Sequence, residues 1–170
     1  MTVHTRTDSP LGELLLVGEE SPTANGGVAL TSLSMPDQRN AARVGPGWQA
    51  ADAAFTEAVR QLQEYFEGRR TTFELDLVAE GTPFQQLVWA AVDTVRYGST
   101  VSYGELARRA GVARSDARAV GTAVGANPLL LVRACHRVIG ADGSLRGYAA
   151  GLPRKEALLT LEGVLQPQLG

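Results

Sequence analysis

The sequence contains a single cysteine, Cys135, and only two histidines, His4 and His136. One cysteine cannot form an internal disulfide, and two histidines without further cysteines do not make a cluster with the spacing of a zinc site. We therefore expect a fold that is stabilised by neither a disulfide nor a metal.

Long apolar runs are also missing. None reaches the length that crosses a bilayer, and the first ten residues, MTVHTRTDSP, lack the basic, apolar and small-residue order of a secretory signal. We expect a cytoplasmic protein without a membrane partner.

The composition is that of a folded globular protein. The 170 residues are 44% hydrophobic and 20% charged, which is enough for one substantial core or two small domains. The net charge of −2 hides an asymmetry, because residues 1–100 carry 7 Lys/Arg and 13 Asp/Glu, whereas residues 101–170 carry 9 and 5. This basic surplus fits a C-terminal part that meets an anionic partner such as DNA, although chance variation on a surface would give the same counts.

The N-terminal part alternates short apolar runs with turn residues, which is typical of strands. Three such runs are LGELLLVG, GGVALTSLSM and TTFELDLVAEG. One helical face is indicated by the spacing of Phe55, Ala58, Val59, Leu62 and Phe66. We predict an α/β domain over residues 1–80, a small mixed sheet with a helix against it, and an exposed loop over residues 36–49.

From residue 82 the pattern changes to helices, and we expect a second domain over residues 81–170. Thr82 is a candidate N-cap, and Ser102 and Ser115 can cap two further short helices. A last helix is expected from Pro153 to Glu162. The two short helices have the size of a helix-turn-helix motif or of an ordinary helical hairpin. Exposed arginines with little acid nearby favour the DNA-binding interpretation: Arg108, Arg109, Arg114 and Arg118.

The segment LVRACHRVIG places basic residues around Cys135. A thiol attacks as its thiolate, and a base or positive charge such as His136, Arg133 or Arg137 favours that form. Adjacent side chains in an extended segment point to opposite faces, so His136 needs a turn or a bridging water to act on the sulfur. Glu162 could orient the imidazole if the fold brings it close. The alternative is a buried, inert cysteine.

The stretch ACHRVIGADGSLRGYAAGLPRKEALLTLEG resembles the active-site block of the O6-alkylguanine-DNA alkyltransferases. Three further stretches are similar to the same family, in order: SPLGELLL, FQQLVWAAVDTVRYGSTVSYGELARRAG and ARAVGTAVGANP. The resemblance implies a ribonuclease H-like α/β N-terminal domain and an α-helical C-terminal domain with a helix-turn-helix. It also implies docking in the minor groove of double-stranded DNA and flipping of an alkylated guanine into a pocket.

By position, the resemblance makes Cys135 the alkyl acceptor and His136 the base that acts on the thiol through a water. Glu162 would orient the histidine, and Tyr103 would assist flipping and donate a proton toward the guanine. The product would be a thioether, which has no carbonyl for water to attack, so one protein molecule removes one lesion. This chemistry requires neither a metal nor another cofactor.

The resemblance also assigns contacts to DNA and to the flipped base. Arg118 would fill the vacated space in the base stack, and Tyr103 would contact DNA as well. Apart from the resemblance, we expect Ala117 and Arg133 to contact DNA. Asn127 matches a hinge asparagine between the second short helix and the cysteine. The implied pocket includes Val138, Tyr148, Ala149 and Ala150. We expect a monomer in solution that associates with the nucleoid and can line up in several copies along DNA.

Four positions depart from the family pattern. Ala134 stands where the family has proline, Arg133 where it has an aliphatic residue, and Arg96 where it prefers proline. We expect Arg133 either to lie along a phosphate or to lower the pKa of Cys135. Ala150 stands where glycine is common, and its methyl group either strains the loop, if φ is positive there, or narrows the pocket.

Two other functions stay open at this point. A lesion-binding protein would flip alkylguanine without transferring the group, as the alkyltransferase-like relatives do, but these lack the cysteine. A cysteine hydrolase acting on amides or esters would turn over repeatedly and would leave the basic helix pair without a role.

Overall fold

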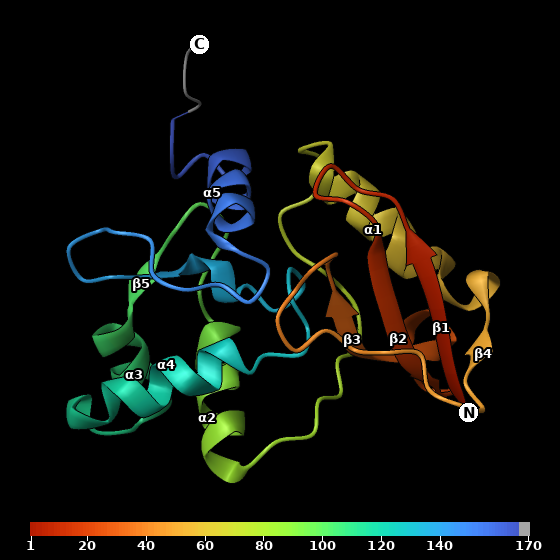
Figure 1. Cartoon of the computed structure of the whole chain (residues 1–170), viewed down its shortest axis with the longest axis horizontal. Helices are drawn as coiled ribbons and strands as arrows, with labels where there is room; N and C mark the ends of the chain where they lie inside the picture. Colours follow the sequence, from red (N-terminus) through yellow and green to blue (C-terminus); the bar gives the residue numbers. More distant parts are fainter. Residues whose placement is uncertain (167–170) are drawn as a thin grey trace. The chain divides into compact units, whose positions relative to one another are not determined.

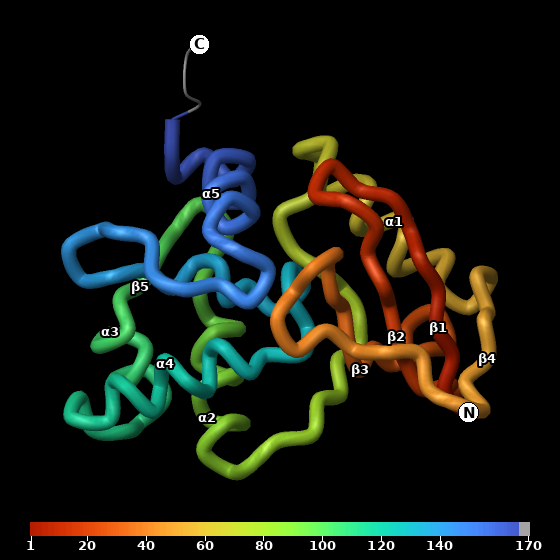
Figure 2. Tube along the Cα trace, viewed as in Figure 1, coloured from red at the N-terminus to blue at the C-terminus, as the bar shows by residue number. Residues whose placement is uncertain are grey.

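The computed structural model describes residues 1–166, and the chain divides into two compact units. Unit 1 consists of Met1–Glu80 and the short segment Pro128–Val132. Unit 2 consists of Gly81–Asn127 and the chain from Arg133 onward. Figure 1 shows the sheet in unit 1 and most of the helices in unit 2, and Figure 2 follows the path of the backbone.

Unit 1 is built on a mixed sheet in the order β3-β2-β1-β4. Its strands are β1 (Thr2–Thr7), β2 (Leu14–Glu20), β3 (Val28–Ser34) and β4 (Gln49–Ala50). The pairs β1–β2 and β2–β3 are antiparallel, and β1–β4 is parallel. A short 3₁₀ turn, η1 (Asn25–Gly27), precedes β3. The mixed sheet that the sequence predicts is therefore confirmed, with its core on the apolar runs of β2 and β3.

Strand β1 has no counterpart among the predicted strands. Its sequence TVHTRT contains one aliphatic residue, Val3, so the alternation of buried and exposed positions is hidden by threonines. Thr5 is nevertheless buried, because its hydroxyl donates a hydrogen bond of 2.6 Å to the Asp52 carboxylate. A buried polar residue with a partner thus takes a core position that the sequence pattern assigns to apolar side chains.

The helix of unit 1, α1 (Thr56–Phe66), follows the 3₁₀ turn η2 (Asp52–Phe55) and lies beside the sheet. Ala58 and Leu62 are buried as predicted, but Tyr65 is buried where the pattern indicated Phe66. The predicted helix is confirmed.

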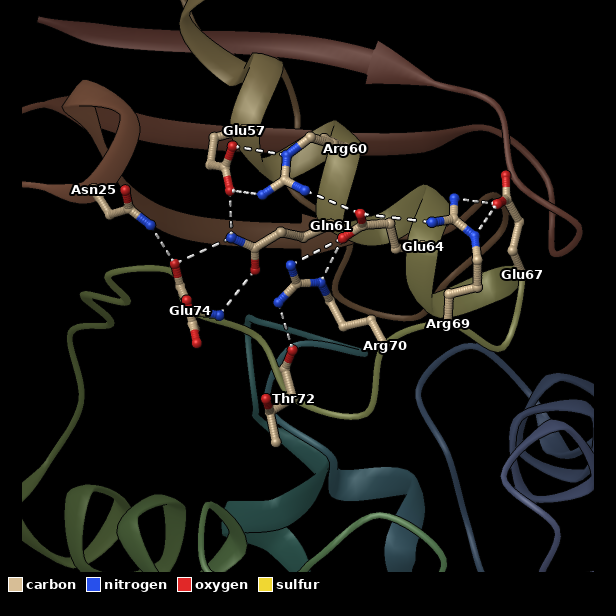
Figure 3. A network of polar contacts seen from close by, with 10 residues as sticks. All are labelled: Asn25, Glu57, Arg60, Gln61, Glu64, Glu67, Arg69, Arg70, Thr72 and Glu74. Atoms are coloured by element: carbon tan, nitrogen blue, oxygen red, sulfur yellow. Dashed lines mark hydrogen bonds and ion pairs between the residues drawn. The ribbon is translucent and has the colours of Figure 1, made fainter.

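The strand predicted in TTFELDLVAEG is mostly wrong. Only Leu77 pairs with the sheet, through a parallel bridge to Leu30. Farther back, the backbone of Glu74 pairs instead with the buried side chain of Gln61, whose Oε1 accepts the Glu74 N–H at 2.8 Å and whose Nε2 donates to the Glu74 carbonyl at 3.2 Å. An amide side chain thereby takes the place of a neighbouring strand (Figure 3).

Around Gln61, α1 carries a network of arginine–glutamate pairs (Figure 3). Glu64 joins Arg60 at 3.0 Å and Arg70 at 2.9 Å, and Arg60 also binds Glu57. Arg70 in turn donates to the Thr72 carbonyl at 3.1 Å, which ties the end of the helix to the chain that follows it. Because most of these groups are partly exposed, the network fixes local geometry more than it stabilises the fold.

Unit 2 is mainly helical. Its helices are α2 (Pro83–Val92), α3 (Tyr103–Ala110), α4 (Ala117–Gly125) and α5 (Leu152–Leu161). Two short strands, β5 (Val101–Ser102) and β6 (Val138–Ile139), pair in parallel. Two 3₁₀ turns complete the unit, η3 (Arg114–Asp116) and η4 (Cys135–Arg137).

The predicted caps explain where two of these helices begin. Thr82 forms a capping box with Gln85, and the Ser102 hydroxyl accepts the Glu105 N–H at 3.1 Å. The prediction that Ser115 caps the next helix is wrong, since Ser115 lies inside η3 and α4 begins after Asp116 without a side-chain cap. Helices α2, α3 and α4 pack against one another, and the Trp89 indole N–H of α2 donates to the Ala123 carbonyl of α4 at 2.9 Å.

Between Asn127 and Arg133 the chain passes through unit 1. Leu129 forms a parallel bridge with Leu33 of β3, in which Leu33 donates to the Pro128 carbonyl at 2.9 Å and Leu130 donates to the Leu33 carbonyl at 3.2 Å. Leu129, Leu130 and Leu131 are all buried. The segment next to the cysteine turn is therefore held by the sheet. Within residues 1–166, no helix has the length and apolar character needed to cross a membrane.

Candidate functional site

Cys135 opens the turn η4 and is buried, with 3% of its surface exposed. Its N–H donates to the Arg133 carbonyl at 2.8 Å, and Ala134 between them has φ −79° and ψ 57°. These values define an inverse γ-turn, a tight three-residue reversal. The backbone is therefore not extended at Cys135, and the turn that we expected for His136 to act near the sulfur is present.

His136 and Glu162 form a fully buried pair. The imidazole Nε2 lies 2.8 Å from Glu162 Oε2, and neither side chain is exposed. Glu162 directly follows α5, so the end of that helix brings the carboxylate to the turn. The structure thus brings together two residues that are 26 positions apart in the sequence.

The protonation state of His136 follows from these contacts. Burial lowers the pKa of His136, although the neighbouring Glu162 carboxylate acts in the opposite direction. We assign a neutral ring whose Nε2–H donates to Glu162, which leaves Nδ1 as an acceptor. Nδ1 is buried and has no hydrogen-bond partner among residues 1–166. An imidazole held in this way has one basic nitrogen available for a proton.

Arg137 completes the pair and was not predicted as part of it. Its guanidinium donates to Glu162 Oε1 at 2.7 Å and Oε2 at 3.0 Å, and to the Val95 carbonyl at 2.7 Å. This two-point contact offsets the cost of burying the Glu162 charge. The only signal in the sequence was the position of Arg137 directly after the histidine.

The thiol of Cys135 is not activated at rest. Burial raises the pKa of Cys135, while a hydrogen bond with the Asn127 side chain and the charges of Lys155 and Arg133 act in the opposite direction. Asn127 also donates from Nδ2 to the Arg133 carbonyl at 3.1 Å. The resting cysteine is therefore a thiol, and its reaction needs a base within reach.

Lys155, the only lysine of the chain, is a second residue that sequence reasoning missed. It is buried in α5, and its ammonium donates to the carbonyls of Val138 at 2.6 Å, Arg146 at 2.9 Å and Gly147 at 3.3 Å. Burial lowers its pKa to about 8, whereas the nearby Cys135 acts in the opposite direction. Lys155 fastens the segment before Tyr148 to β6. The available signal was that the chain has one lysine, which lies between Arg154 and Glu156 in the last helix.

Two tyrosines lie near the thiol. Burial raises the pKa of Tyr103, the first residue of α3, and raises that of Tyr148 well above its ordinary value, and the charge of Cys135 adds to both shifts. The Tyr148 hydroxyl is buried and has no hydrogen-bond partner among the described residues. Tyr148 therefore presents an unused polar group beside the cysteine.

Ala149 and Ala150 are also buried. Within residues 1–166, the non-glycine residues with positive φ are Asp37, Asn40 and Leu131, so Ala150 is not among them. The strained-loop alternative for Ala150 is thus excluded, and the narrowing of the pocket by its methyl group stays a prediction.

The residues expected to contact DNA differ between α4 and α3 in whether an acidic residue pairs with them. Arg118 and Ala117 stand at the start of α4, where Arg118 is exposed. The statement that acid is scarce near the arginines is wrong for α3, because Glu105 binds Arg108 at 2.6 Å and Arg109 at 3.3 Å. These pairs lower the pKa of Glu105 to about 2. The unneutralised basic surface is therefore narrower than the sequence suggested.

Arg133 is not on the surface. Only 7% of the residue is exposed, and its guanidinium donates to the two oxygens of Asp93 at 3.2 and 3.4 Å. It also lies over the Trp89 ring, 5.4 Å from the centroid. This internal engagement counts against a contact with a phosphate and leaves the other predicted role, an effect on Cys135.

Comparison with known proteins places both halves of the chain in one family. Residues 83–164 match the model described as "6-O-methylguanine DNA methyltransferase, DNA binding domain". Residues 2–79 match the one described as "6-O-methylguanine DNA methyltransferase, ribonuclease-like domain".

Individual proteins are similar over nearly the whole length. A Mycobacterium leprae protein named methylated-DNA–protein-cysteine methyltransferase is 49% identical over 162 residues, which cover 94% of this chain and 92% of that protein. A Methanosarcina acetivorans protein of the same name is 42% identical, covering 92% and 95%. The structure of Mycobacterium tuberculosis OGT in complex with DNA matches with a TM-score of 0.84 and 45% identity, covering 94% of this chain and 92% of that one.

Proposed function

Since the chain belongs to the 6-O-methylguanine DNA methyltransferase family, we propose that it repairs O6-alkylguanine, chiefly O6-methylguanine, in double-stranded DNA. The alkyl group is transferred to Cys135 in a single turnover. The observation that carries the proposal is the buried His136–Glu162 pair next to the only cysteine, in which His136 Nδ1 has no hydrogen-bond partner among residues 1–166.

The chemistry begins with removal of the thiol proton. His136 Nδ1 accepts it through a bridging water, and Glu162 holds the imidazole in the required orientation and stabilises its charged form. The sulfur then forms a bond to the alkyl carbon while the bond between that carbon and guanine O6 breaks. Tyr103 donates a proton toward the guanine ring, so that the base leaves neutral. The proton held by His136 then replaces the one that Tyr103 has lost. The thioether that results is permanent.

Access to the lesion requires the guanine to leave the helix. We assign α3 and α4 to a helix-turn-helix that docks in the minor groove, with Arg118 filling the gap in the base stack and Ala117 beside the backbone. The exposed position of Arg118 at the start of α4 supports this role. Flipping costs a few kcal/mol of stacking, which the inserted side chain and the pocket offset.

The pocket for the flipped base lies beside Cys135. We assign Tyr148, Ala149 and Ala150 to its lining, together with the backbone near Val138, whose carbonyl already accepts a hydrogen bond from Lys155. Asn127 lies shortly after the end of α4, and its side chain bonds both the Arg133 carbonyl and the Cys135 thiol. These contacts support its role as a hinge between α4 and the cysteine turn. The Tyr148 hydroxyl, which has no hydrogen-bond partner within residues 1–166, supports a polar contact with the guanine.

The remaining expectations follow from this chemistry. The reaction needs no metal or cofactor, because the acceptor, the base and the acid are all side chains of residues 81–170. That range is proposed as the transfer domain and residues 1–80 as its ribonuclease-like companion. We propose a cytoplasmic monomer that associates with the nucleoid when it binds DNA, with several copies able to lie side by side.

The mass of the intact protein tests the function directly. After one exposure to duplex DNA that contains O6-methylguanine, we expect a lasting gain of one methyl group, located on Cys135 by peptide mapping. Cys135→Ser is the control and should gain none. A lesion-binding protein would retain its mass while retarding the DNA, and a hydrolase would show turnover of an ester without a lasting mark. Either result would overturn the proposal.

A further inference from the structure

Arg133 lies two positions before Cys135, and its side chain is buried. Its guanidinium is clamped between the Asp93 carboxylate, at the C-terminal end of α2, and the Trp89 ring one helical turn earlier. Trp89 is in turn fixed by its hydrogen bond to α4. The side chain therefore links the cysteine turn to the packed helices of unit 2.

The backbone of Arg133 is equally engaged. Its carbonyl accepts two hydrogen bonds, one from the Cys135 N–H at 2.8 Å and one from Asn127 Nδ2 at 3.1 Å. The first of these closes the γ-turn that presents the sulfur. Any movement of Arg133 would consequently move the carbonyl around which the turn is formed.

Ala134, the centre of this turn, contributes no stiffness. Its φ of −79° lies within the range that a proline ring imposes, and its N–H has no hydrogen-bond partner in the part of the chain that the structure describes. A proline would therefore fit here, and its ring would hold φ near the value that the turn requires. With alanine present, the order of the turn must come from its neighbours.

We propose that Arg133 is the positioning residue of the cysteine turn. Its side chain, held by Asp93 and Trp89, fixes the direction of the Cys135 thiol and takes over the restriction that a proline at position 134 would impose. The inference rests on the proposed alkyl transfer for its consequence, but the order of the turn can be measured without that reaction.

A second observation supports a role for the buried Arg133 guanidinium near Cys135. The Arg133 Nη1 is buried and has no partner among the described residues, so the guanidinium is kept inside at a cost in stability. Other groups also act on the thiol: Lys155 from α5 and the Asn127 side chain favour the thiolate, whereas the Tyr103 and Tyr148 hydroxyls lie near it as neutral groups. The Arg133 charge adds to the effect of Lys155, since both favour the ionised sulfur.

A double-mutant cycle tests the proposal. The variants are Arg133→Leu, Ala134→Pro and the two combined, and the measurements are the single-turnover rate of methyl transfer and the rate of Cys135 alkylation by iodoacetamide as a function of pH. We expect Arg133→Leu to slow transfer by about tenfold with Ala134 present, but by less than about threefold with proline at position 134. The midpoint of the alkylation profile should rise in both Arg133→Leu proteins, because proline restores position and not charge.

Amide hydrogen exchange of Cys135 separates this inference from the proposed function. The exchange should accelerate in Arg133→Leu and return toward the wild-type rate in the double variant, whether or not any methyl group is transferred. Asp93→Asn is the matched variant, since it weakens the same clamp from the other side and leaves the turn sequence intact. It carries the test if Arg133→Leu does not fold.

The proposal would be overturned if Arg133→Leu reduced the transfer rate by the same factor with alanine and with proline at position 134. Unchanged exchange at Cys135 in both Arg133→Leu and Asp93→Asn would overturn it as well. If the exchange pattern is as expected but the wild-type protein accepts no methyl group, the proposed function alone would be overturned.

Discussion

His136 is the residue on which the proposed chemistry depends most. Burial lowers its pKa below the ordinary 6.5, so the ring stays neutral and basic at pH 6.5 and above. We expect the single-turnover transfer rate to be constant between pH 7.5 and about 6.5 and to fall only in more acidic solution. Rates measured across this range in constant ionic strength check the prediction.

The same shift has a consequence for stability. A base whose pKa is lower in the folded protein is protonated first in the unfolded chain, so the free energy of unfolding decreases as the pH falls through 6.5. Urea denaturation at each pH separates this loss from the loss of activity. A transfer rate that is already half lost at pH 7, in protein that remains folded, would contradict the assignment of His136 as a neutral base.

Ala150 gives a prediction about substrate size. Because its backbone is not in the left-handed region, its buried methyl group acts only by occupying space. We expect Ala150→Gly to increase benzyl transfer from O6-benzylguanine by about tenfold relative to methyl transfer. The methyl rate of the same variant is the internal control, and an equal change in both rates would show that the loop, rather than the space, was altered.

Among the helices, α2 offers a clean test of how the sequence fixes an element. Thr82 caps it through the Gln85 N–H at 3.1 Å, and the Gln85 side chain reaches back to the Thr82 N–H at 3.0 Å. We expect Thr82→Ala to lower the free energy of unfolding by about 1 kcal/mol, and Thr82→Ser, which keeps the hydroxyl, to have little effect. Urea denaturation of both variants provides the measurement, and equal stabilities would contradict the capping role.

The helices and the elements with runs of aliphatic residues could be predicted from the sequence. Local signals specify them: a capping threonine or serine, an apolar face, a run such as LGELLLVG. The predictions failed where a side chain replaced a regular partner. β1 was missed because a hydrogen-bonded threonine occupies its buried position, and the strand near Glu74 was wrong because Gln61 takes the place of a neighbouring strand.

The site was predicted in part. Cys135, His136 and Glu162 were expected together, and the structure brings the last two into contact. Lys155 and Asp93 were missed, and Arg137 was named without its partner Glu162, because these roles depend on burial and on contacts between distant segments. The spacing of residues along a sequence does not indicate which charged side chains the fold will bury.

At the level of the whole molecule, the segment Pro128–Val132 belongs to unit 1 and directly precedes the cysteine turn in the sequence. Leu129 bridges to Leu33, and Leu131 adopts φ +73° shortly before the chain returns to Arg133. A leucine with positive φ is strained and persists only where packing enforces it. We infer that loosening this segment disturbs the turn that presents Cys135.

A matched pair of variants tests this coupling. Leu129→Ala and Leu16→Ala both remove a fully buried leucine from unit 1, and each should lower the free energy of unfolding by about 2 to 5 kcal/mol. Only Leu129→Ala should also slow methyl transfer, when both proteins are assayed under conditions in which they are folded. Equal rates in the two variants would show that the segment has no influence on the cysteine.

The burial of Lys155 also bears on the fate of the protein after its one reaction. Lys155 is the only side-chain amine in the chain, and in the folded state its nitrogen is covered and bonded to three carbonyls. Any disposal route that marks spent molecules on lysine would find no accessible acceptor until unit 2 opens. By such a route, alkylated copies would be marked only after the fold around Lys155 opens.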